Sequence, residues 1–478
     1  MWDESEKKGG GSLRLYHRAL EETMREKFSQ FLRRCFMMLN PGTEYLHNWH
    51  IDLISEYLQA CRRREIRRLI INVPPRSLKS IAVSVAWPAF LLGHNPALRI
   101  MAASYAAGLS VKHSVDRRNV VQSAWYRNVF PDMELSQEQN EKHKFLTTRF
   151  GHRIATSVGG TATGEGGDFL IVDDPQNPAL VAGEATRRVA AQWFDHTFSS
   201  RLDNKREGVI VVVMQRLHAQ DLTGHLLEKG GWEHLRIPAI ADRRLVYEMG
   251  DMRVVRGEGD ILHPAREDAA IIKQAQRELG SMAFAAQYQQ EPVPESGEMM
   301  RREWLRYYAA VPEQFERVVQ SWDTAIKAGA EHDASVCLTV GESEGRSYLL
   351  DIAVLRAEYP ELRRAVLRMA ERYVPDIILM EDKASGQSLL QDMRRQHPAL
   401  PMVAVCPVAD KITRFAAVSA MIEAGRVWLP REAAWLSGFE REILGFPAGK
   451  HDDQVDALTQ YLGWLRGRVA ARPRIRQL

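Results

Sequence analysis

Cysteine is scarce in this chain of 478 residues, which holds only Cys35, Cys61, Cys337 and Cys406. The four are far apart and form no CxxC pair, which excludes a zinc-ribbon site or a disulfide framework and indicates a reducing compartment. No apolar run is long enough to span a bilayer, and the polar start MWDESEKKGGG lacks the apolar core of a secretory signal. We therefore expect a cytoplasmic protein that does not enter a membrane.

An excess of charge of one sign is also lacking. The chain has 64 Lys and Arg against 61 Asp and Glu, a net charge of +3. Composition alone therefore does not indicate a nucleic-acid-binding protein, and any DNA site has to arise from local clustering. With 45% apolar and 26% charged residues the chain has the balance of a folded protein. Its length exceeds what one hydrophobic core ordinarily serves and predicts two domains.

The first half of the chain alternates short apolar runs with helical stretches. Two helices are expected first, over 13–38 and 49–61, with the breaker Asn40-Pro41-Gly42 between them. Four runs that are nearly continuous in apolar residues, as buried parallel strands are, follow at 68–73, 99–104, 169–174 and 208–214. This alternation predicts an α/β domain with a parallel sheet and helices on both faces.

A polar stretch with two prolines and a glycine, at 291–298, separates this pattern from a second one. Three consecutive strands with short loops, expected to be antiparallel, lie at 318–325, 335–341 and 348–355. Further strands at 376–381 and 401–406 alternate with helices near 361–373, 411–424 and 453–466. The predicted organisation is an N-terminal helical tail (1–44), a first α/β domain (45–295), a linker (296–315) and a second α/β domain with a mixed sheet (316–478).

A strand, a tight loop and a helix follow one another around 68–86, the order found in nucleotide phosphate loops. In such loops backbone N–H groups face the phosphates, a lysine reaches the β/γ oxygens and a serine hydroxyl binds Mg²⁺. The two glycine positions of the usual pattern hold Val73 and Leu78, so the match read alone is weak. The predicted ATP contacts are Arg76, Ser77, Lys79 and Ser80.

Two later strands end in polar residues that suit the same site. The strand 169–174 ends in Asp173, a predicted Mg²⁺ ligand, and Asp174, a predicted water-activating carboxylate. The strand 208–214 ends at Gln215, which would sense the γ-phosphate, and the glycine-rich stretch 158–168 suits a moving loop. The alternative for each is an ordinary strand exit with solvated polar residues.

Three groups of carboxylates mark the second domain. Asp323 lies in its first strand, Glu381 ends its fourth, and three aspartates open its last helix, namely Asp452, Asp453 and Asp456. A carboxylate on a buried strand is costly unless it is paired or bound to metal. Together these groups predict a site for Mg²⁺ or Mn²⁺ ions that cut a phosphodiester. Individually, a turn cap, a lysine pair and a helix start explain them equally well.

Basic residues flank the predicted metal site and are candidates for contacts to DNA phosphates. They are Lys383, Lys411, Arg414 and Lys450. For any single one, a solvated surface position is the alternative.

At this point the chain resembles a known family. The resemblance spans Trp49 to Leu458 and rests on PPRSLKS, FLIVDDP, QRLHAQDLTG, RIPAIAD, HPAR, AAQYQQEPVPESG, SWDTA, EDKASGQSL and HDDQVDAL, which occur in the order seen in phage terminase large subunits. Two unrelated catalytic modules joined by the family's linker phrase make the resemblance specific.

The resemblance implies a P-loop ATPase domain followed by a ribonuclease H-like nuclease. It implies an ATP-driven motor that moves viral double-stranded DNA into a procapsid, and an endonuclease that cuts concatemeric DNA. It implies a homo-oligomeric ring on the portal protein, a small terminase subunit as partner, and a place in the host cytoplasm, transiently on the procapsid. For individual residues, the resemblance implies ATP contacts at Trp49 and His50 in addition to the phosphate loop. It places Gln215 at the position that couples ATP hydrolysis to motion. Asp323, Glu381 and Asp453 become the nuclease's catalytic metal ligands.

The chain departs from the family pattern in three places. Leu78 stands where the loop usually has glycine, Gln215 where threonine is usual, and Asp174 where glutamate is usual. One alternative is therefore a DNA endonuclease whose first domain binds nucleotide or docks without hydrolysis. Others are a helicase- or recombination-type motor and a non-enzymatic scaffold. The candidates for an arginine that acts on the neighbouring subunit of a ring are Arg117, Arg118 and Arg201.

Overall fold

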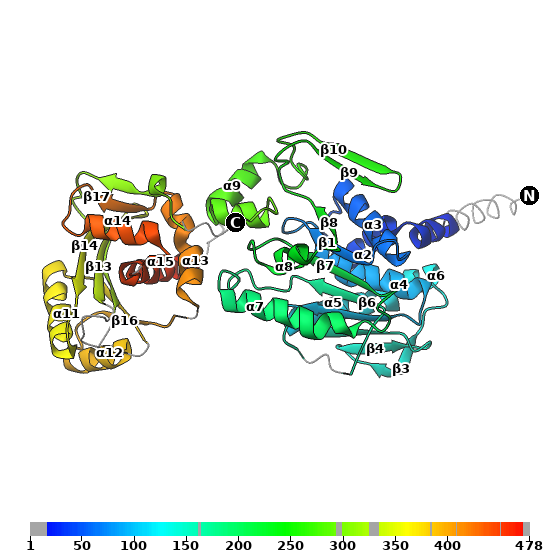
Figure 1. The fold of residues 1–478 in the computed structure, drawn as a ribbon, viewed down its shortest axis with the longest axis horizontal. Helices are drawn as coiled ribbons and strands as arrows, with labels where there is room; N and C mark the ends of the chain where they lie inside the picture. The colour runs from blue at the N-terminus through cyan, green and yellow to red at the C-terminus, as the bar shows by residue number, and fades with distance from the viewer. Residues whose placement is uncertain are drawn as a thin grey trace, which may run out of the picture. The chain divides into compact units, whose positions relative to one another are not determined.

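A computed structural model of the chain describes residues 17–160, 164–292, 299–324, 334–382, 385–407, 409–449 and 451–471. The chain divides into two compact units, with Met1–Ala275 and Met282–Val293 assigned to unit 1 and Gln276–Ser281 and Pro294–Leu478 to unit 2. Both units are α/β, as the sequence predicts (Figure 1). No helix in the described part of the chain is long and apolar enough to cross a membrane.

Unit 1 is built on a sheet of eight strands. Their spatial order is β3 (Leu135–Asn140), β4 (Lys144–Thr147), β5 (His152–Ser157), β2 (Arg99–Ser104), β6 (Phe169–Asp173), β7 (Val209–Met214), β1 (Arg68–Asn72) and β8 (Glu233–Arg236). The strands from β5 to β8 are parallel. All four strands predicted here are confirmed within one or two residues at each end.

The sheet is not wholly parallel, which corrects the sequence prediction. β3 and β4 pair antiparallel at one edge, because the chain between them is a short turn rather than a helix. Their residues carry many charges and polar groups and lack the continuous apolar run of a buried strand, so the apolar pattern did not reveal them.

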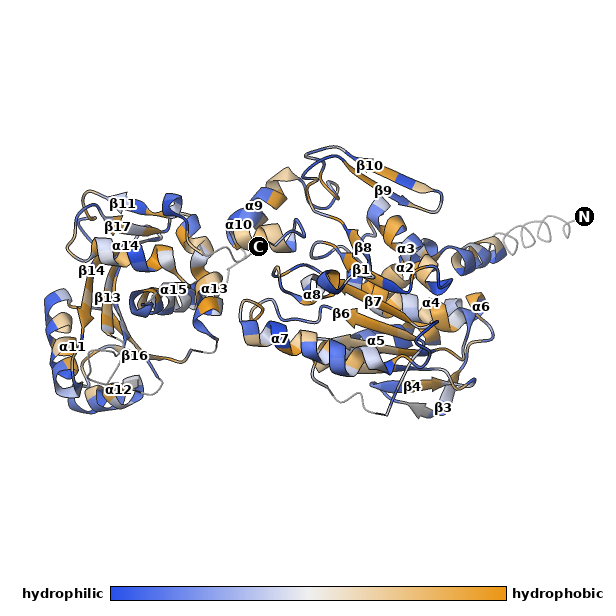
Figure 2. Ribbon diagram, in the orientation of Figure 1, coloured by the Kyte–Doolittle hydropathy of each residue, from blue (hydrophilic) through white to orange (hydrophobic). Residues whose placement is uncertain are grey.

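Helices cover both faces of this sheet, and alternate residues of each central strand point to opposite faces. Leu69 and Ile71 face one core and Ile70 faces the other, so the central strands are apolar throughout (Figure 2). The first face carries α2 (Phe28–Leu39), α3 (Trp49–Arg62), the π-helical turn η1 (Ile81–Ala86), α4 (Trp87–His94), α5 (Ala107–Gln122) and α6 (Ala124–Val129). The second carries α7 (Glu184–Trp193), η2 (Phe194–Phe198) and α8 (Leu222–Lys229), and the short turn η3 (Ser199–Arg201) follows η2 without a buried residue.

The N-terminal segment differs from the tail predicted for residues 1–44. The expected single helix is interrupted at Lys27, whose backbone is extended. α2 then buries Phe28, Phe31 and Leu32 in the core of unit 1. The remaining elements of the first 292 residues are the hairpin β9 (Leu245–Met249) and β10 (Met252–Arg256), α9 (Ala269–Leu279) and α10 (Ser281–Gln287).

Unit 2 has a mixed seven-stranded sheet. Its order is β11 (Arg306–Tyr308), β17 (Val427–Pro430), β14 (Arg346–Leu355), β13 (Ser335–Ser343), β12 (Arg317–Asp323), β15 (Ile377–Glu381) and β16 (Met402–Val405). The three consecutive strands β12, β13 and β14 are antiparallel, as predicted, and β12 pairs with β15 in parallel. Parallel pairing places the ends of β12 and β15 at the same edge of the sheet.

Helices again cover both faces of the sheet. One core packs α13 (Lys411–Glu423), α14 (Leu436–Gly445) and α15 (Asp453–Ala471), and the other packs α11 (Tyr359–Tyr373) and α12 (Ser385–Gln396). Part of the predicted linker 296–315 belongs to this unit, because Met300, Trp304 and Leu305 lie in its core and β11 pairs with β17. The short turn η4 (Arg302–Trp304) precedes β11, and residues 293–298 of the predicted junction lie outside the described residues.

Candidate functional site

The predicted phosphate loop lies between β1 and η1 and adopts backbone angles that its non-glycine residues disfavour. Arg76 and Leu78 have φ of +64° and +60°, the left-handed region that favours glycine. A non-glycine residue there costs about 1 kcal/mol. The loop therefore reaches this conformation with leucine in place of glycine. Ser77 is buried, and its hydroxyl has no hydrogen-bond partner among the described residues.

Asp173, at the end of β6, is fully buried against the start of the helix that follows the loop. Its carboxylate accepts hydrogen bonds from the Ser80 hydroxyl at 3.0 Å and the Ser84 hydroxyl at 2.7 Å. Burial raises the pKa of Asp173, while these hydroxyls and the Lys79 ammonium oppose the rise. His113 Nδ1 lies 3.4 Å from the same carboxylate, and burial lowers the pKa of His113 to about 4. His113 is therefore neutral at pH 7.

Asp174 faces the loop from the other side. Lys79 Nζ donates to its carboxylate at 2.8 Å, and the backbone N–H of Asp174 donates to the Val213 carbonyl in β7 at 2.9 Å. Burial raises the pKa of Asp174, and Lys79 opposes that rise. β7 lies between β6 and β1 in the sheet, which is why its end reaches both the acidic pair and the loop. The fold thus brings together Lys79, Ser80, Asp173, Asp174 and Gln215.

Trp49 and His50, at the start of α3, lie beside a second polar segment that the sequence reasoning did not assign. Trp49 packs on Tyr247 with ring centroids 5.5 Å apart, and His50 packs on His263 at 5.7 Å. Arg266, three residues on, donates to the carbonyl of Arg76 in the phosphate loop. The segment 263–266 therefore joins the Trp49–His50 region to the loop.

The three arginines that are candidates for action on a neighbouring subunit differ in how deeply they are buried. Arg117 is fully buried, and its guanidinium lies 3.7 Å from the Phe145 ring centre. As placed, it cannot extend to a neighbouring subunit, which removes it from the candidates. Arg201 is half-buried and donates to the Thr197 carbonyl at 3.1 Å. Arg118 is half-buried as well.

In unit 2 the carboxylates meet at the edge where β12 and β15 end. Asp323 and Glu381 come from these two paired strands. α12 starts close to that edge, since a Cβ on Gly386 would lie 2.1 Å from the Glu381 carbonyl oxygen. α15 lies across β12, and its Gln460 donates to the Ser321 hydroxyl at 3.0 Å and to the Trp322 carbonyl at 3.2 Å. This places the first turn of α15 beside Asp323.

A pocket of about 290 Å³ forms where these elements meet. Its lining residues are Asp323, Thr324, Ala334, Glu381, Pro407, Ala409, Asp410, Lys411, Arg414, Asp453 and Asp456. Burial, and then the charges of Asp456, Glu381 and Asp453, raise the pKa of Asp323 to about 8. Mutual repulsion of this kind indicates a site that a cation would stabilise.

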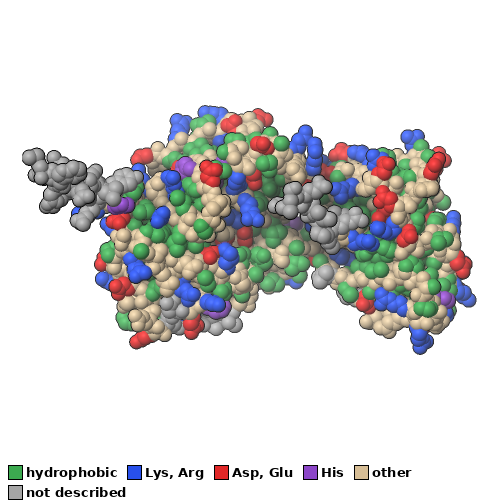
Figure 3. Space-filling model, turned by 180° about the vertical axis from the view of Figure 1, so that it is seen from behind, with side chains coloured by type: hydrophobic (Ala, Val, Ile, Leu, Met, Phe, Trp, Pro, Cys, Tyr) green, Lys and Arg blue, Asp and Glu red, His purple; other side chains and the backbone are tan. Residues whose placement is uncertain are grey.

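Two of the predicted DNA contacts form ion pairs with these carboxylates, and the Lys411 side chain is still 47% exposed. Lys411 Nζ lies 2.6 Å from Asp452 and 2.8 Å from Asp456, and Arg414 donates to Asp456 at 2.8 Å. The aspartates raise the pKa of Lys411 against its partial burial. Lys383 and Lys450 lie outside the described residues. On the face shown in Figure 3, Lys and Arg side chains are spread over both units with Asp and Glu among them, so no single-sign surface marks a DNA path there.

The donor set suits Mg²⁺ or Mn²⁺ in its chemistry, since both ions prefer carboxylate oxygens. As the side chains stand, no three His, Cys, Asp or Glu side chains of the described residues form a set that holds a metal ion. Lys411 takes up the charge of Asp452 and Asp456. Asp323, Glu381 and Asp453, which the sequence predicts as metal ligands, line the pocket together with Asp410, the N-cap residue of α13.

Comparison with known proteins shows what this fold is similar to. Residues 320–463 match the family described as the terminase RNaseH-like domain. The structure of the large terminase from the thermophilic bacteriophage D6E is similar over 87% of this chain and 98% of that chain, with a TM-score of 0.54 and 10% identity. The chain has the fold of a phage large terminase. The same D6E protein in complex with ATP-gamma-S matches over 86% and 98%, with a TM-score of 0.52 and 10% identity. No curated protein sequence matches the chain.

The terminase fold confirms the resemblance seen in the sequence and the expected pair of α/β domains. Several residues at the first site were not predicted. Ser84 lies one helical turn after Ser80, a spacing that could have indicated it. Arg266 belongs to HPAR, one of the stretches that carry the resemblance, but only the structure shows its bond to the loop. Nothing in the local sequence of His113 relates it to Asp173.

Proposed function

We propose that this chain is the large subunit of a phage terminase, a motor that uses ATP to move double-stranded DNA into a procapsid and an endonuclease that cuts that DNA. The supporting observation is that one chain carries two separate polar constellations on a terminase fold. One joins Lys79 to Asp174 and Ser80 to Asp173, and the other gathers Asp323, Glu381 and Asp453. A scaffold protein would have no use for either set.

At the first site the residues divide the work of ATP hydrolysis. Lys79 would exchange its bond to Asp174 for the β- and γ-phosphates, which frees that carboxylate to orient the attacking water. Ser80 and Asp173 would hold Mg²⁺, which neutralises phosphate charge when bound. Arg76 and Ser77 would add phosphate contacts, and Trp49 and His50 would lie on the base side. The similar D6E terminase was solved with ATP-gamma-S, which supports nucleotide binding.

At the second site Asp323, Glu381 and Asp453 would hold one or more divalent ions, with Asp452 and Asp456 as further ligands. Such ions supply an activated water and stabilise the leaving oxygen of a phosphodiester. Lys411 and Arg414 orient Asp456 through ion pairs. Any contact of these two side chains with a DNA phosphate would compete with those pairs.

The terminase assignment carries further proposals about partners. The chain would act in the host cytoplasm as a ring docked on the portal protein of a procapsid, together with a small terminase subunit. It would cut concatemeric DNA at the start and end of packaging.

The deciding experiment is DNA-stimulated ATP hydrolysis by the purified chain, with plasmid cutting measured in parallel. We expect Lys79→Ala to lose turnover and keep cutting, and Asp323→Ala to lose cutting and keep turnover. Glu303→Gln, at an exposed surface carboxylate, serves as the control for both. The motor assignment is wrong if the wild type does not hydrolyse ATP even with procapsid and portal present. The alternative, an endonuclease with a docking domain that does not hydrolyse ATP, then replaces it.

A further inference from the structure

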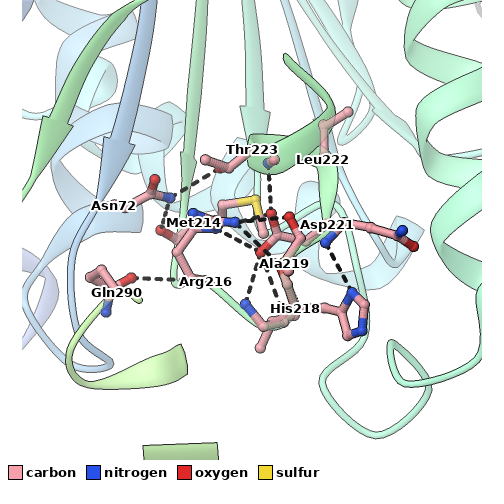
Figure 4. Close-up of polar contacts among 12 residues, drawn as sticks. Asn72, Met214, Arg216, His218, Ala219, Asp221, Leu222, Thr223 and Gln290 are labelled. Atoms are coloured by element: carbon pink, nitrogen blue, oxygen red, sulfur yellow. Dashed lines mark hydrogen bonds and ion pairs between the residues drawn. The ribbon is translucent and has the colours of Figure 1, made fainter. Parts of the chain in front are cut away.

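The strand β7 ends in a buried polar network just beyond the proposed ATP site (Figure 4). Arg216 Nε lies 3.0 Å from both carboxylate oxygens of Asp221, and its Nη2 donates to the carbonyls of His218 and Ala219 at 3.2 Å. Asp221 is fully buried and also accepts from the backbone N–H of Gly224, so it caps α8. A Cβ on residue 224 would lie 1.9 Å from the Ala219 carbonyl oxygen, so only glycine allows the turn to close this tightly. The turn 216–221 is therefore a rigid block.

Gln290 attaches the end of unit 1 to this block. Its Oε1 accepts the backbone N–H of Arg216 at 2.8 Å, and its amide group donates to the Gln287 carbonyl. The side chain is buried, and the backbone has a φ of +55°. Glycine would adopt that φ without strain, whereas glutamine there is strained. The side-chain bonds offset this strain.

The strand β7 connects this block to the nucleotide site. The carboxylate of Asp174 pairs with Lys79 of the phosphate loop, and the backbone N–H of Asp174 donates to the Val213 carbonyl in β7 at 2.9 Å. Three residues after Val213, the N–H of Arg216 donates to Gln290. Hydrogen bonds and the end of β7 therefore connect the loop lysine to the segment from which the chain continues into unit 2.

We propose that Gln290 is a positioning residue that transmits the state of the nucleotide site to the segment leaving unit 1. This rests on the proposed function, because it takes Lys79 and Asp174 to exchange partners when nucleotide binds. That exchange releases the Asp174 side chain from the loop, shifts the end of β7 to which the Asp174 backbone is bonded, and alters the bond from Arg216 to Gln290. Because the Arg216–Asp221 pair holds the turn 216–221 rigid, this turn does not deform and passes the movement on to Gln290. Gln290 contacts no reacting atom, so its role is separate from hydrolysis itself.

The test compares hydrogen exchange of the amides in residues 284–292 in the full chain, with and without ATP-gamma-S. In the wild type we expect nucleotide to change these rates. In Gln290→Leu the segment should exchange about tenfold faster, as loss of a buried hydrogen bond implies, and should no longer respond to nucleotide. Nucleotide affinity and basal ATP turnover should stay near the wild-type values, whereas DNA translocated per ATP should fall.

The neighbouring glutamine provides a matched control. Gln289 makes two hydrogen bonds of 2.9 Å to the backbone of Ile240 and none to the β7 turn. Gln289→Leu should therefore loosen the segment and keep its response to nucleotide. Gln290→Gly relieves the strained φ without restoring the bond, so it should fold well and still be uncoupled.

The proposal is overturned if Gln290→Leu or Gln290→Gly retains the nucleotide response, or if the wild type shows none. These outcomes are distinct from failure of the motor assignment, which appears as absence of ATP turnover in the wild type. A chain that binds ATP-gamma-S without turnover would still reveal whether the Gln290 bond follows the nucleotide.

Discussion

Asp323 should destabilise the metal-free protein, and the effect should depend on pH. Burial and three neighbouring carboxylates raise its pKa from 3.8 to about 8, with Lys411 opposing the rise. Between these two values the folded chain therefore holds a proton that the unfolded chain has released. Linkage then requires the free energy of unfolding to fall as pH rises through this window, by about 1.4 kcal/mol per pH unit for one such group. Above pH 8 the loss levels off.

Asp323→Asn keeps the size of the side chain and removes the titration. The variant should be more stable than the wild type by a margin that is small near pH 4 and reaches a few kcal/mol by about pH 7. The change of this stability difference with pH is a sharper prediction than its size. Packing differences between Asp and Asn change the stability difference by the same amount at every pH. The same variant should lose DNA cutting, because the carboxylate would no longer be available to a metal ion.

The assay is urea unfolding of the full chain with chelator present, from about pH 5 to pH 8.5, followed by hydrogen exchange of β12 and β13 amides. Glu303→Gln, at a side chain that is 70% exposed, should give a margin that does not change with pH. A margin for Asp323→Asn that stays constant within about 0.4 kcal/mol per pH unit would refute the reasoning, since a group with the ordinary pKa gives that result.

Three further predictions concern single side chains. Asp221→Ala leaves the buried Arg216 guanidinium without its counter-charge and should lower the free energy of unfolding of unit 1 by about 3–5 kcal/mol in urea titrations; a loss under about 1 kcal/mol contradicts a tight ion pair. Ser84→Ala removes a hydroxyl that lowers the pKa of Asp173, so a larger fraction of this carboxylate should be protonated at low pH. Calorimetry should therefore show a larger loss of Mg²⁺-nucleotide affinity at pH 6 than at pH 8, and equal losses at both pH values count against the bond. Lys411→Met removes the cation that lowers the pKa of Asp323, so the pH at which Mn²⁺ binding reaches half its maximum should move upward, and an unchanged midpoint would exclude the interaction.

Continuous apolar runs made the central strands predictable, because a strand buried on both faces admits few polar residues. β2 spans Arg99–Ser104, the same residues as the run in the sequence. The edge strands could not be predicted in this way. β3 and β4 are partly exposed and carry glutamate, lysine and asparagine, so their position in a sheet depends on the pairing partner rather than on their own pattern.

Some of the candidate site residues could likewise be predicted from local sequence, and others could not. Lys79, Ser80, Asp173 and Asp174 could be selected because local order (strand, loop, helix) places them at a strand end. The bond from Asp174 to Val213 could not be predicted without the strand order, because it requires β7 to lie beside β6. The ion pairs of Lys411 and Arg414 with Asp452 and Asp456 could not be predicted either. A helical turn with basic residues has the same local sequence whether it contacts DNA or an acidic neighbour.

The sequence by itself determined which segments become buried strands and amphipathic helices, and which strand ends carry carboxylates, since these depend on the period and polarity of neighbouring residues. Only the tertiary structure decided which strand ends adjoin, that Leu78 can occupy a left-handed position, and that Gln290 bonds to the end of β7. Such contacts join residues separated by dozens of positions. The free energy that selects them comes from packing and burial of the whole sheet, which no local stretch of sequence contains.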